Sequence, residues 1–322
     1  MEKIDKNRFQ WVGPNAEESE GMARPSVTYW RDAMGRLVKN KVALVCAIII
    51  ILLILASLIF PLVSPFEGRE QHLTHTNAPL FSTCDQNGQM HIFGTDSLGR
   101  DLFTRLWEGG RVSMFIAFAA VICNLIIGVV YGGISGYFGG AVDNVMMRII
   151  EIINGIPYLI VVILLMMILP PGLMTIVVAY ATTGWTGMAR LVRGQVISLK
   201  EQEFVVAAKA LGANAPRLIL RHLLPNSLSV VIVNLTLSIP NAIFTEAFLS
   251  YIGLGVPVPL SSWGMLAQAG SAAMRTYPSQ LIIPALCISL TMFSFNLLGD
   301  GLRDAFDPVS YTHLTLPTTS RV

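Results

Sequence analysis

The chain has 322 residues, of which 53% are hydrophobic and only 13% are charged, and its formal net charge is +2 at pH 7. Because about a quarter of the residues of a soluble globular protein are charged, this composition excludes that class and indicates an integral membrane protein. The small net charge gives no indication of a nucleic-acid partner.

Residues 1–41 form a polar N-terminal segment that becomes amphipathic toward its end. Beyond about Arg24, the apolar side chains of Trp30, Met34 and Leu37 share one helical face. This pattern predicts a helix that lies in the membrane interface and leads into the first span.

Six runs with few or no charges are long enough to cross a hydrocarbon core of about 30 Å, which takes roughly 20 helical residues. They cover residues 42–63, 112–137, 142–169, 173–190, 227–254 and 279–298. A proline- and glycine-rich turn at residues 170–172 makes the third and fourth runs a predicted hairpin. The first run lies too far from the N-terminus for a cleaved signal peptide, so we expect an uncleaved anchor.

Lys and Arg residues set the expected orientation, because they accumulate in cytoplasmic segments. Most of these basic residues lie in residues 1–41 and in the loop at 191–226, with Arg190 beside it. Few lie in the segments on the opposite side. Both termini and the 191–226 loop are therefore predicted to be cytoplasmic.

Residues 64–111 form the largest extracytoplasmic loop. Asp96 is a candidate helix cap, and Leu102, Phe103 and Leu106 lie on one face of the helix expected to follow it. We expect this amphipathic helix to bend at two glycines, residues 109–110, before it enters the second span.

Polar and helix-breaking residues inside spans are costly and become candidates for function. Asn154 and Pro157 are expected to interrupt the third span and could line a pathway. Asp143 is expected to snorkel or pair at a cytoplasmic helix end. Glu246 has no basic residue nearby in the sequence, so it must be neutral, hydrogen-bonded or face a polar cavity. Helix packing and substrate contact both remain open for this residue.

Residues 204–225 form a compact basic module between two spans. Phe204, Ala207, Ala208 and Leu211 predict a narrow apolar stripe on a first helix, which Gly212 is expected to end. Asn214 and Pro216 are suited to cap and start a second helix, which Pro225 is expected to end. An ordinary cytoplasmic loop is the alternative interpretation.

The spacing of this module resembles the coupling loop of ATP-binding-cassette (ABC) importer permeases. That loop has Glu-Ala-Ala, three residues, Gly, nine residues, Ile, one residue and Leu-Pro. Val206 replaces the Glu and His222 replaces the Ile, as in the peptide-transporting branch. The candidate ATPase-coupling residues are Ala207, Ala208, Gly212, Arg217, His222, Leu224 and Pro225.

Further strings resemble the second-subunit type of dipeptide and oligopeptide permeases of the binding-protein-dependent transport family. One lies in the extracytoplasmic loop and comprises Gly94, Thr95, Asp96, Leu98, Gly99, Arg100 and Asp101. The resemblance runs through residues 29–308. The tail at 309–322 matches nothing in these relatives, and we expect it to be disordered.

The resemblance implies an all-α, six-helix type I ABC importer permease in a bacterial cytoplasmic membrane. The cytoplasmic coupling helix would belong to a core at residues 112–308. The implied partners are a homologous permease, two ATPase subunits that bind ATP and Mg, and an extracytoplasmic substrate-binding protein. The sequence has no phosphate-cradling Gly-x-x-x-x-Gly-Lys-Ser/Thr string, so any ATP used must bind to a separate chain.

The resemblance predicts no catalytic residue in this chain and no cofactor of its own, and the cysteine spacing predicts no metal site. Nickel, glutathione or another small solute is an alternative cargo, since such importers are similar. Two alternatives from other classes are an ion-coupled secondary transporter, which would favour internal repeats and charged relays, and a membrane scaffold that transports nothing.

Overall fold

The computed structural model describes residues 29–83, 88–170, 172–257 and 259–306, and it confirms the expected all-α class. The helices are α2 Tyr29–Lys39, α3 Lys41–Val63, α4 Leu102–Phe138, α5 Gly140–Gly155, α6 Tyr158–Ile168, α7 Leu173–Thr183, α8 Trp185–Leu199, α9 Glu203–Ala210, α10 Ala215–Leu218, α11 Leu224–Tyr251, α12 Trp263–Ala273 and α13 Ser279–Phe306. A short 3₁₀ helix (η2, Leu73–His75) and two antiparallel strands (β1 Ser82–Thr83, β2 Met90–His91) lie in the loop before α4, and a π-helix (η3, Ile219–Leu223) precedes α11. The 309–322 tail lies outside the described residues.

Long apolar helices set the architecture. Within the described ranges, four helical stretches are long and apolar enough to cross a membrane, and α5 with α6 makes a fifth if this pair, bent by 82°, is one span. The break has a local cause, because Pro157 lacks an N–H and forces Ile156 into an extended conformation. The fourth expected span is divided at Gly184 into α7 and α8. The count of six spans therefore stays a prediction.

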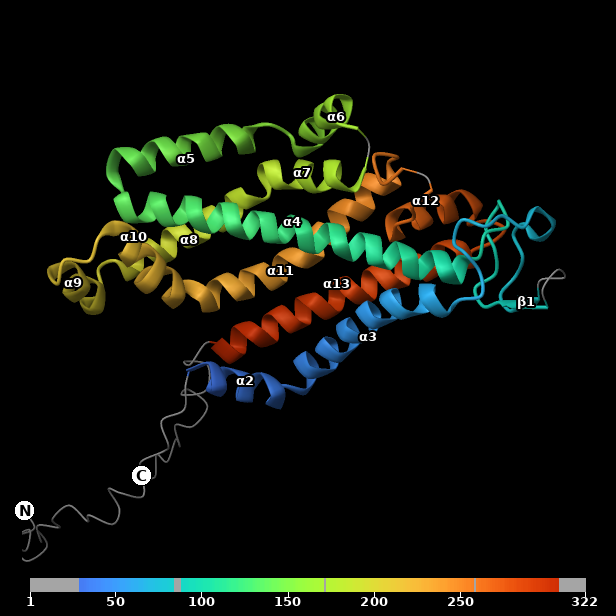
Figure 1. The fold of residues 1–322 in the computed structure, drawn as a ribbon, viewed down its shortest axis with the longest axis horizontal. Coiled ribbons are helices and arrows are strands. Elements are labelled where there is room, and N and C mark those ends of the chain that lie inside the picture. The colour runs from blue at the N-terminus through green and yellow to red at the C-terminus, as the bar shows by residue number, and fades with distance from the viewer. Residues whose placement is uncertain (1–28, 84–87, 171, 258, 307–322) are drawn as a thin grey trace, which may run out of the picture.

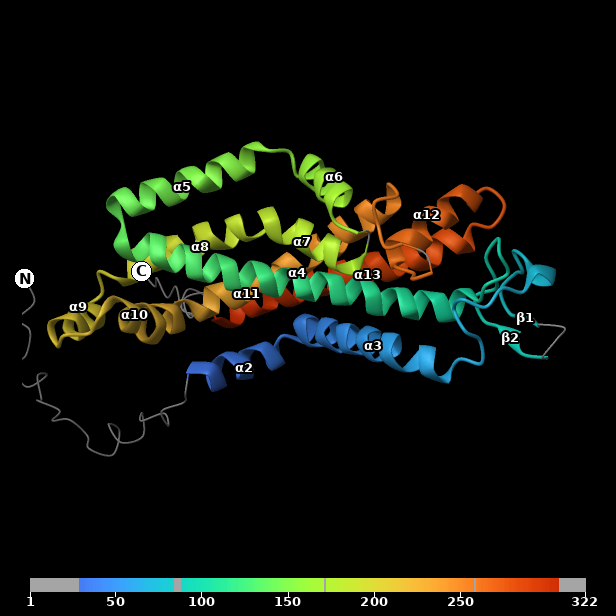
Figure 2. The same ribbon diagram turned by 45° about the horizontal axis from the view of Figure 1, so that its top comes forward.

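The helices are arranged along one long axis. Figures 1 and 2 show α4, α11 and α13 running through the middle, α3 along one side, and α5 with α6 on the opposite side of α4. Helices α9 and α10 lie at one end, and the loop with β1 and β2 lies at the other. Since α4 has 37 residues, it is roughly 55 Å long and exceeds a hydrocarbon core of about 30 Å. The two ends can therefore lie on opposite sides of a bilayer.

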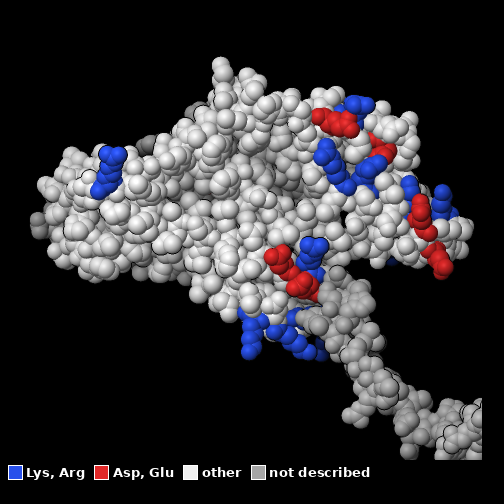
Figure 3. Space-filling view, turned by 180° about the vertical axis from the view of Figure 1, so that it is seen from behind, with Lys and Arg blue, Asp and Glu red and all other residues white. Residues whose placement is uncertain are grey.

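The distribution of charge agrees with this arrangement. Figure 3 shows that charged side chains gather at the end that carries α9 and α10 and around α2, whereas the middle of this face is uncharged. An uncharged band between two polar ends is what a bilayer requires of the lipid-facing surface.

The central core joins four of the long helices. Its buried members include Ile50 from α3, Val121 from α4, Ile243 from α11 and Phe295 from α13. This packing holds the middle of the bundle together and leaves the two ends free to carry polar structures.

Helix α8 lies unusually close to α4 because glycines line the contact. Gly128, Gly132 and Gly136 are four residues apart and therefore share one face of α4. A Cβ atom at Gly132 would lie 2.3 Å from the carbonyl oxygen of Ala189, and one at Gly136 would lie 2.8 Å from that of Arg193. These glycines, with Gly128 beside Met188 and the Trp185 carbonyl, therefore allow the close approach of α8 to α4.

Two expectations about the start of α4 are wrong. The helix cap is Asp101, whose carboxylate accepts a 2.7 Å hydrogen bond from the Thr104 N–H, rather than Asp96. The helix also continues through the two glycines where we expected a bend. A Cβ atom at Gly110 would lie 2.7 Å from Cζ2 of the fully buried Trp263, so the glycine makes room for the indole.

We expect Gly132→Ala to destabilise the protein, because the added methyl group meets the α8 backbone and overpacking typically costs about 1–3 kcal/mol. The midpoint of thermal unfolding of the detergent-purified protein should fall by several degrees. Gly194→Ala is the matched control, since a Cβ atom there would have no neighbour within 4 Å. Equal midpoints for the two variants would contradict the close α4–α8 contact.

Candidate functional site: the elbow and its supports

We use the term elbow for residues 203–223, which comprise α9, the turn after it, α10 and η3. The turn depends on Gly212, whose φ of +87° lies in the left-handed region that glycine adopts without strain. The Gly212 N–H donates to the Lys209 carbonyl at 3.0 Å and closes the end of α9. Asn214 then caps α10, as predicted, by accepting a 3.2 Å bond from the Arg217 N–H.

Both helices of the elbow are anchored to the bundle. Val205 of α9, Leu218 of α10 and Leu223 of η3 are buried in one cluster with Val192 and Val196 of α8. Apolar burial on both sides of the turn holds the elbow rigidly against α8. The elbow is therefore packed against the bundle on both sides of its turn.

The outer face of the elbow is apolar and exposed. Phe204 and Ala207 are exposed, and Leu211 has 89% of its surface accessible. Ala208, the fourth member of the expected stripe, is half-buried and packs toward the α8 cluster. Exposed apolar side chains at a charged end of the molecule are typical of a protein contact surface.

The prediction that Pro225 ends the second helix is wrong. Residues 215–251 form one continuous helical stretch, and Pro225 occupies the first turn of α11. Proline lacks an N–H and crowds the carbonyl four residues earlier. The preceding π-helical turn relieves this conflict, since the Leu224 N–H donates to the carbonyl of Ile219, five residues back. The elbow consequently joins α11 without a flexible loop.

The remaining candidate coupling residues lie on or beside the elbow. Arg217 is exposed, and His222 and Leu224 are half-buried. The carbonyl of His222 accepts a 2.6 Å hydrogen bond from the side chain of Asn226. The structure thus brings the predicted coupling residues together in one compact region.

An ion pair supports the elbow from the neighbouring helices. Arg193 of α8 donates two hydrogen bonds of 2.5 Å to Asp143 of α5, and Ser135 of α4 donates a third of 2.5 Å. Lys200 also donates to the Gly136 carbonyl at 3.3 Å. The expected pairing of Asp143 is confirmed, and it ties α5, α4 and α8 together beside the elbow.

The extracytoplasmic motif forms a tight polar loop at the opposite end. Asp96 accepts hydrogen bonds from the backbone N–H groups of Leu98 and Arg100 at 2.9 and 3.0 Å and pairs with the Arg105 guanidinium. Asp101, besides capping α4, accepts a 2.9 Å hydrogen bond from Nδ1 of His91. The two carboxylates therefore organise the loop and the helix start.

Two glycines and a threonine complete this loop. Gly94 and Gly99 have φ values of +74° and +71°, and a Cβ atom at Gly99 would lie 2.0 Å from the carbonyl oxygen of His72. Thr95 accepts a 2.8 Å bond from the Ala78 N–H. These contacts explain why the motif has glycine and threonine at these positions, because the fold of the loop depends on them.

Glu246 is buried in a network of hydroxyl groups, with only 1% of its surface accessible. Its two carboxylate oxygens accept bonds of 2.7 and 2.8 Å from Ser113 and Ser250. Ser113 also accepts a 3.1 Å bond from the Trp263 N–H. The hydrogen-bonded alternative is confirmed, and the contacts favour helix packing, since Glu246 links α11 to α4 and to the start of α12.

The two other intramembrane candidates lie apart from Glu246. The side-chain oxygen of Asn154 accepts a 3.1 Å bond from Thr186 on α8, and Pro157 marks the break between α5 and α6. Both residues are exposed on this chain. A role in the pathway stays a prediction.

Sequence reasoning missed the serines around Glu246. Ser250 could have been found, because it lies one helical turn after Glu246. Ser113 lies 133 residues away in the sequence, and nothing local connects the two. In the described ranges, no group of three or more His, Cys, Asp or Glu side chains is placed to hold a metal ion.

Comparison with known proteins gives a consistent assignment. Residues 128–309 match the family of binding-protein-dependent transport system inner membrane components, and residues 28–79 match the N-terminal transmembrane domain of oligopeptide transport permease C. The chain is 48% identical to the Bacillus subtilis oligopeptide transport system permease protein OppC, with 96% of this chain and 99% of the relative covered. It is also 48% identical to the dipeptide transport system permease protein DppC of the same organism, with 93% and 92% covered. For the Escherichia coli K12 OppC protein the identity is 41%, with 90% and 94% covered.

We expect Ser113→Ala to destabilise the protein, because it removes a donor from buried Glu246 and an acceptor from the Trp263 N–H. Leaving buried polar groups unpaired costs about 1–3 kcal/mol, so the thermal midpoint should fall by several degrees. Ser227→Ala is the control, since that buried hydroxyl bonds only to the carbonyl of Leu224 in its own helix. The network is not stabilising if both substitutions have the same small effect.

Proposed function

The chain belongs to the family of binding-protein-dependent transport system inner membrane components, and we propose that it is the second permease subunit of an ABC importer for di- or oligopeptides. As a member of this family it is a multi-pass inner-membrane permease. The peptide cargo is supported by the two relatives at 48% identity, whose names refer to oligopeptide and dipeptide transport.

The observation that carries the coupling role is the anchored elbow with an exposed apolar face. Val205 and Leu218 hold the elbow to α8, and Leu211 projects from it. Such an element can receive a push from a soluble partner and pass it to α8 and α11, because the elbow joins α11 through continuous helix.

The proposed partners follow from what the chain lacks and what the family implies. Two peripheral ATPase subunits would bind ATP and Mg and contact the elbow of this chain and that of a homologous permease. A substrate-binding protein would deliver the peptide on the other side. The Lys and Arg residues at 1–41 and 190–226 support a cytoplasmic elbow and cytoplasmic termini.

The proposed mechanism is alternating access in a type I importer arrangement. Closure of the two ATPases on ATP would move the elbows, and the permease helices would then rock from inward-open to outward-open. Peptide would enter the cavity from the binding protein and leave toward the cytoplasm after hydrolysis. The contribution of this chain is mechanical: a rigid elbow, a close α4–α8 contact and continuous helices.

Competing functions make different predictions for purification. An importer of nickel, glutathione or another small solute would keep its ATPase subunits but would not accumulate peptide. An ion-coupled secondary transporter or a scaffold would retain no ATPase after mild solubilisation. Copurification combined with uptake of a labelled peptide therefore distinguishes the proposal from all three alternatives.

We expect Gly212→Pro to abolish transport while the protein still inserts into the membrane, because proline cannot adopt the positive φ of this turn. Gly212→Asn is the control, since asparagine tolerates the left-handed conformation and a Cβ atom there would have no neighbour within 4 Å. Uptake of labelled peptide and the amount of protein in the membrane are measured for both variants. Unchanged uptake by the proline variant would refute the lever.

We expect Leu211→Asp to reduce ATPase copurification about tenfold or more, since it places a charge in a desolvated contact. Leu73→Asp is the matched control, because Leu73 is also highly exposed but lies in the loop at the opposite end. ATPase retained per permease is quantified after mild solubilisation. If both variants retain as much ATPase as the unmodified protein, the outer face of the elbow is not the contact.

A further inference from the structure

A cavity of about 500 Å³ lies between α8, α11 and α13, in the half of the bundle that carries the elbow. Its walls are formed by Leu191, Ser229, Val230, Val233, Asn234, Leu237, Arg303 and Phe306. This volume lies within the range of about 300–1,000 Å³ that is common for small-molecule sites. Most of the lining is apolar, and its polar groups come from three residues.

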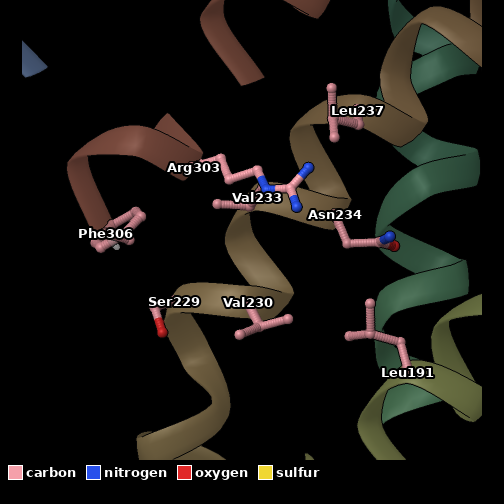
Figure 4. Close-up of a pocket in the computed structure, with 8 residues that line it drawn as sticks. All are labelled: Leu191, Ser229, Val230, Val233, Asn234, Leu237, Arg303 and Phe306. Carbon is pink, nitrogen blue, oxygen red and sulfur yellow. The ribbon is translucent and has the colours of Figure 1, made fainter. Parts of the chain in front are cut away.

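Arg303 supplies the charge of this cavity. Figure 4 shows its side chain extending from α13 toward α11, with the guanidinium directed to the side where Asn234 projects. Within the described ranges, no carboxylate lies within ion-pair distance of Arg303, although Asp300 and Asp304 are close in the sequence. Among the described residues, the cavity therefore presents a guanidinium with no carboxylate paired to it beside apolar walls, and such a group binds carboxylates by two parallel hydrogen bonds.

A second cavity lies next to the first, and Asn234 lines both. It measures about 240 Å³ and is lined by Val121, Asn124, Tyr180, Gly184, Gly187, Met188, Asn234, Leu235 and Ser238. Ser238 lies one turn beyond Asn234 on α11, farther from the elbow, so this cavity reaches deeper into the bundle.

The deeper cavity contains a polar atom that lacks a partner. Asn124 has only 6% of its surface accessible, and its side-chain oxygen accepts no hydrogen bond from the residues that the structure describes. A buried amide oxygen of this kind is normally satisfied. A ligand that carries N–H donors would satisfy it, whereas a lipid acyl chain would not.

We propose that these two neighbouring cavities, which share Asn234, bind a peptide on its way to the cytoplasm, with the C-terminal carboxylate on Arg303 and main-chain amides reaching toward Asn124. The apolar walls accommodate side chains of varied shape, which suits a peptide carrier of broad specificity. This inference rests on the proposed peptide-import function and assigns a substrate contact to this chain. An anionic lipid headgroup is the competing occupant, but it leaves the Asn124 oxygen unpaired.

The test compares uptake of labelled trialanine with uptake of its C-terminal amide, in cells that contain the complete transporter. Arg303→Gln is expected to lower trialanine uptake about tenfold relative to the unmodified protein, because a charge-assisted pair is lost. The same variant should take up the amide at the same rate as the unmodified protein. Arg303→Lys keeps the charge but not the two-pronged geometry, so an intermediate loss confined to trialanine is expected.

Arg148→Gln is the control for loss of an arginine, since Arg148 is exposed on α5, pairs with Glu151 and lines neither cavity. It should change neither uptake. The inference is overturned if both Arg303 variants match the unmodified protein, or if they impair the two peptides equally. The uptake experiment is repeated in reconstituted vesicles with different phosphatidylglycerol contents. If the loss of uptake in the Arg303 variants depends on the phosphatidylglycerol content and not on the peptide carboxylate, Arg303 binds lipid and the inference is overturned.

The experiment distinguishes failure of the peptide-import function from failure of the carboxylate site. If the unmodified transporter accumulates neither peptide, the proposed peptide-import function is wrong. If it accumulates trialanine and Arg303→Gln does so equally well, peptide import stands and only the carboxylate site is lost.

Discussion

The close backbone contact between α4 and α8 is the constraint on which the rest of the structure depends. Gly132 and Gly136 allow the α8 carbonyls to approach to distances that no side chain would permit. Because α8 also carries the anchors of the elbow, this contact fixes the elbow relative to the whole bundle. In a bilayer, where the hydrophobic effect does not drive helices together, small-residue packing of this kind is a main source of helix association.

Polar networks reinforce the bundle at both ends of this contact. Near the elbow, Asp143 and Arg193 connect α5 to α8, and near the other end Glu246 connects α11 to α4 through Ser113. Buried polar groups are costly unless they are satisfied, so each network favours one arrangement of its helices. The middle of the bundle between them has an apolar core, beside which the cavity at Asn124 lies, whereas the cavity at Arg303 lies in the half that carries the elbow. Polar networks near both ends and a packed core between them suit a protein that moves as a lever.

How far the sequence predicts this structure depends on the range of the interactions. The turn at Gly212 and the cap at Asn214 follow from local backbone requirements, and the family resemblance follows from residue order. The error at Pro225 arose because a π-helical turn, which local patterns do not reveal, lets the helix continue. Glu246 is paired with Ser113, and Trp263 packs against Gly110, which lie far away in the sequence. Only the folded chain brings these residues together. Hydropathy does not determine how an apolar run folds where proline or glycine interrupts it, so the count of six spans stays a prediction.

The most direct test of the account is the side of the membrane on which the elbow lies. Leu211→Cys is made in a protein in which Cys84, the cysteine of the 64–111 loop, is replaced by Ser. It is labelled with a membrane-impermeant maleimide in intact cells and in inside-out vesicles. Leu73→Cys in the same background is the reference for the opposite end. The account predicts that Leu211→Cys reacts only in inside-out vesicles and that Leu73→Cys reacts only in intact cells. Reaction of Leu211→Cys in intact cells would contradict it, because an elbow outside the cell cannot receive force from a cytoplasmic ATPase.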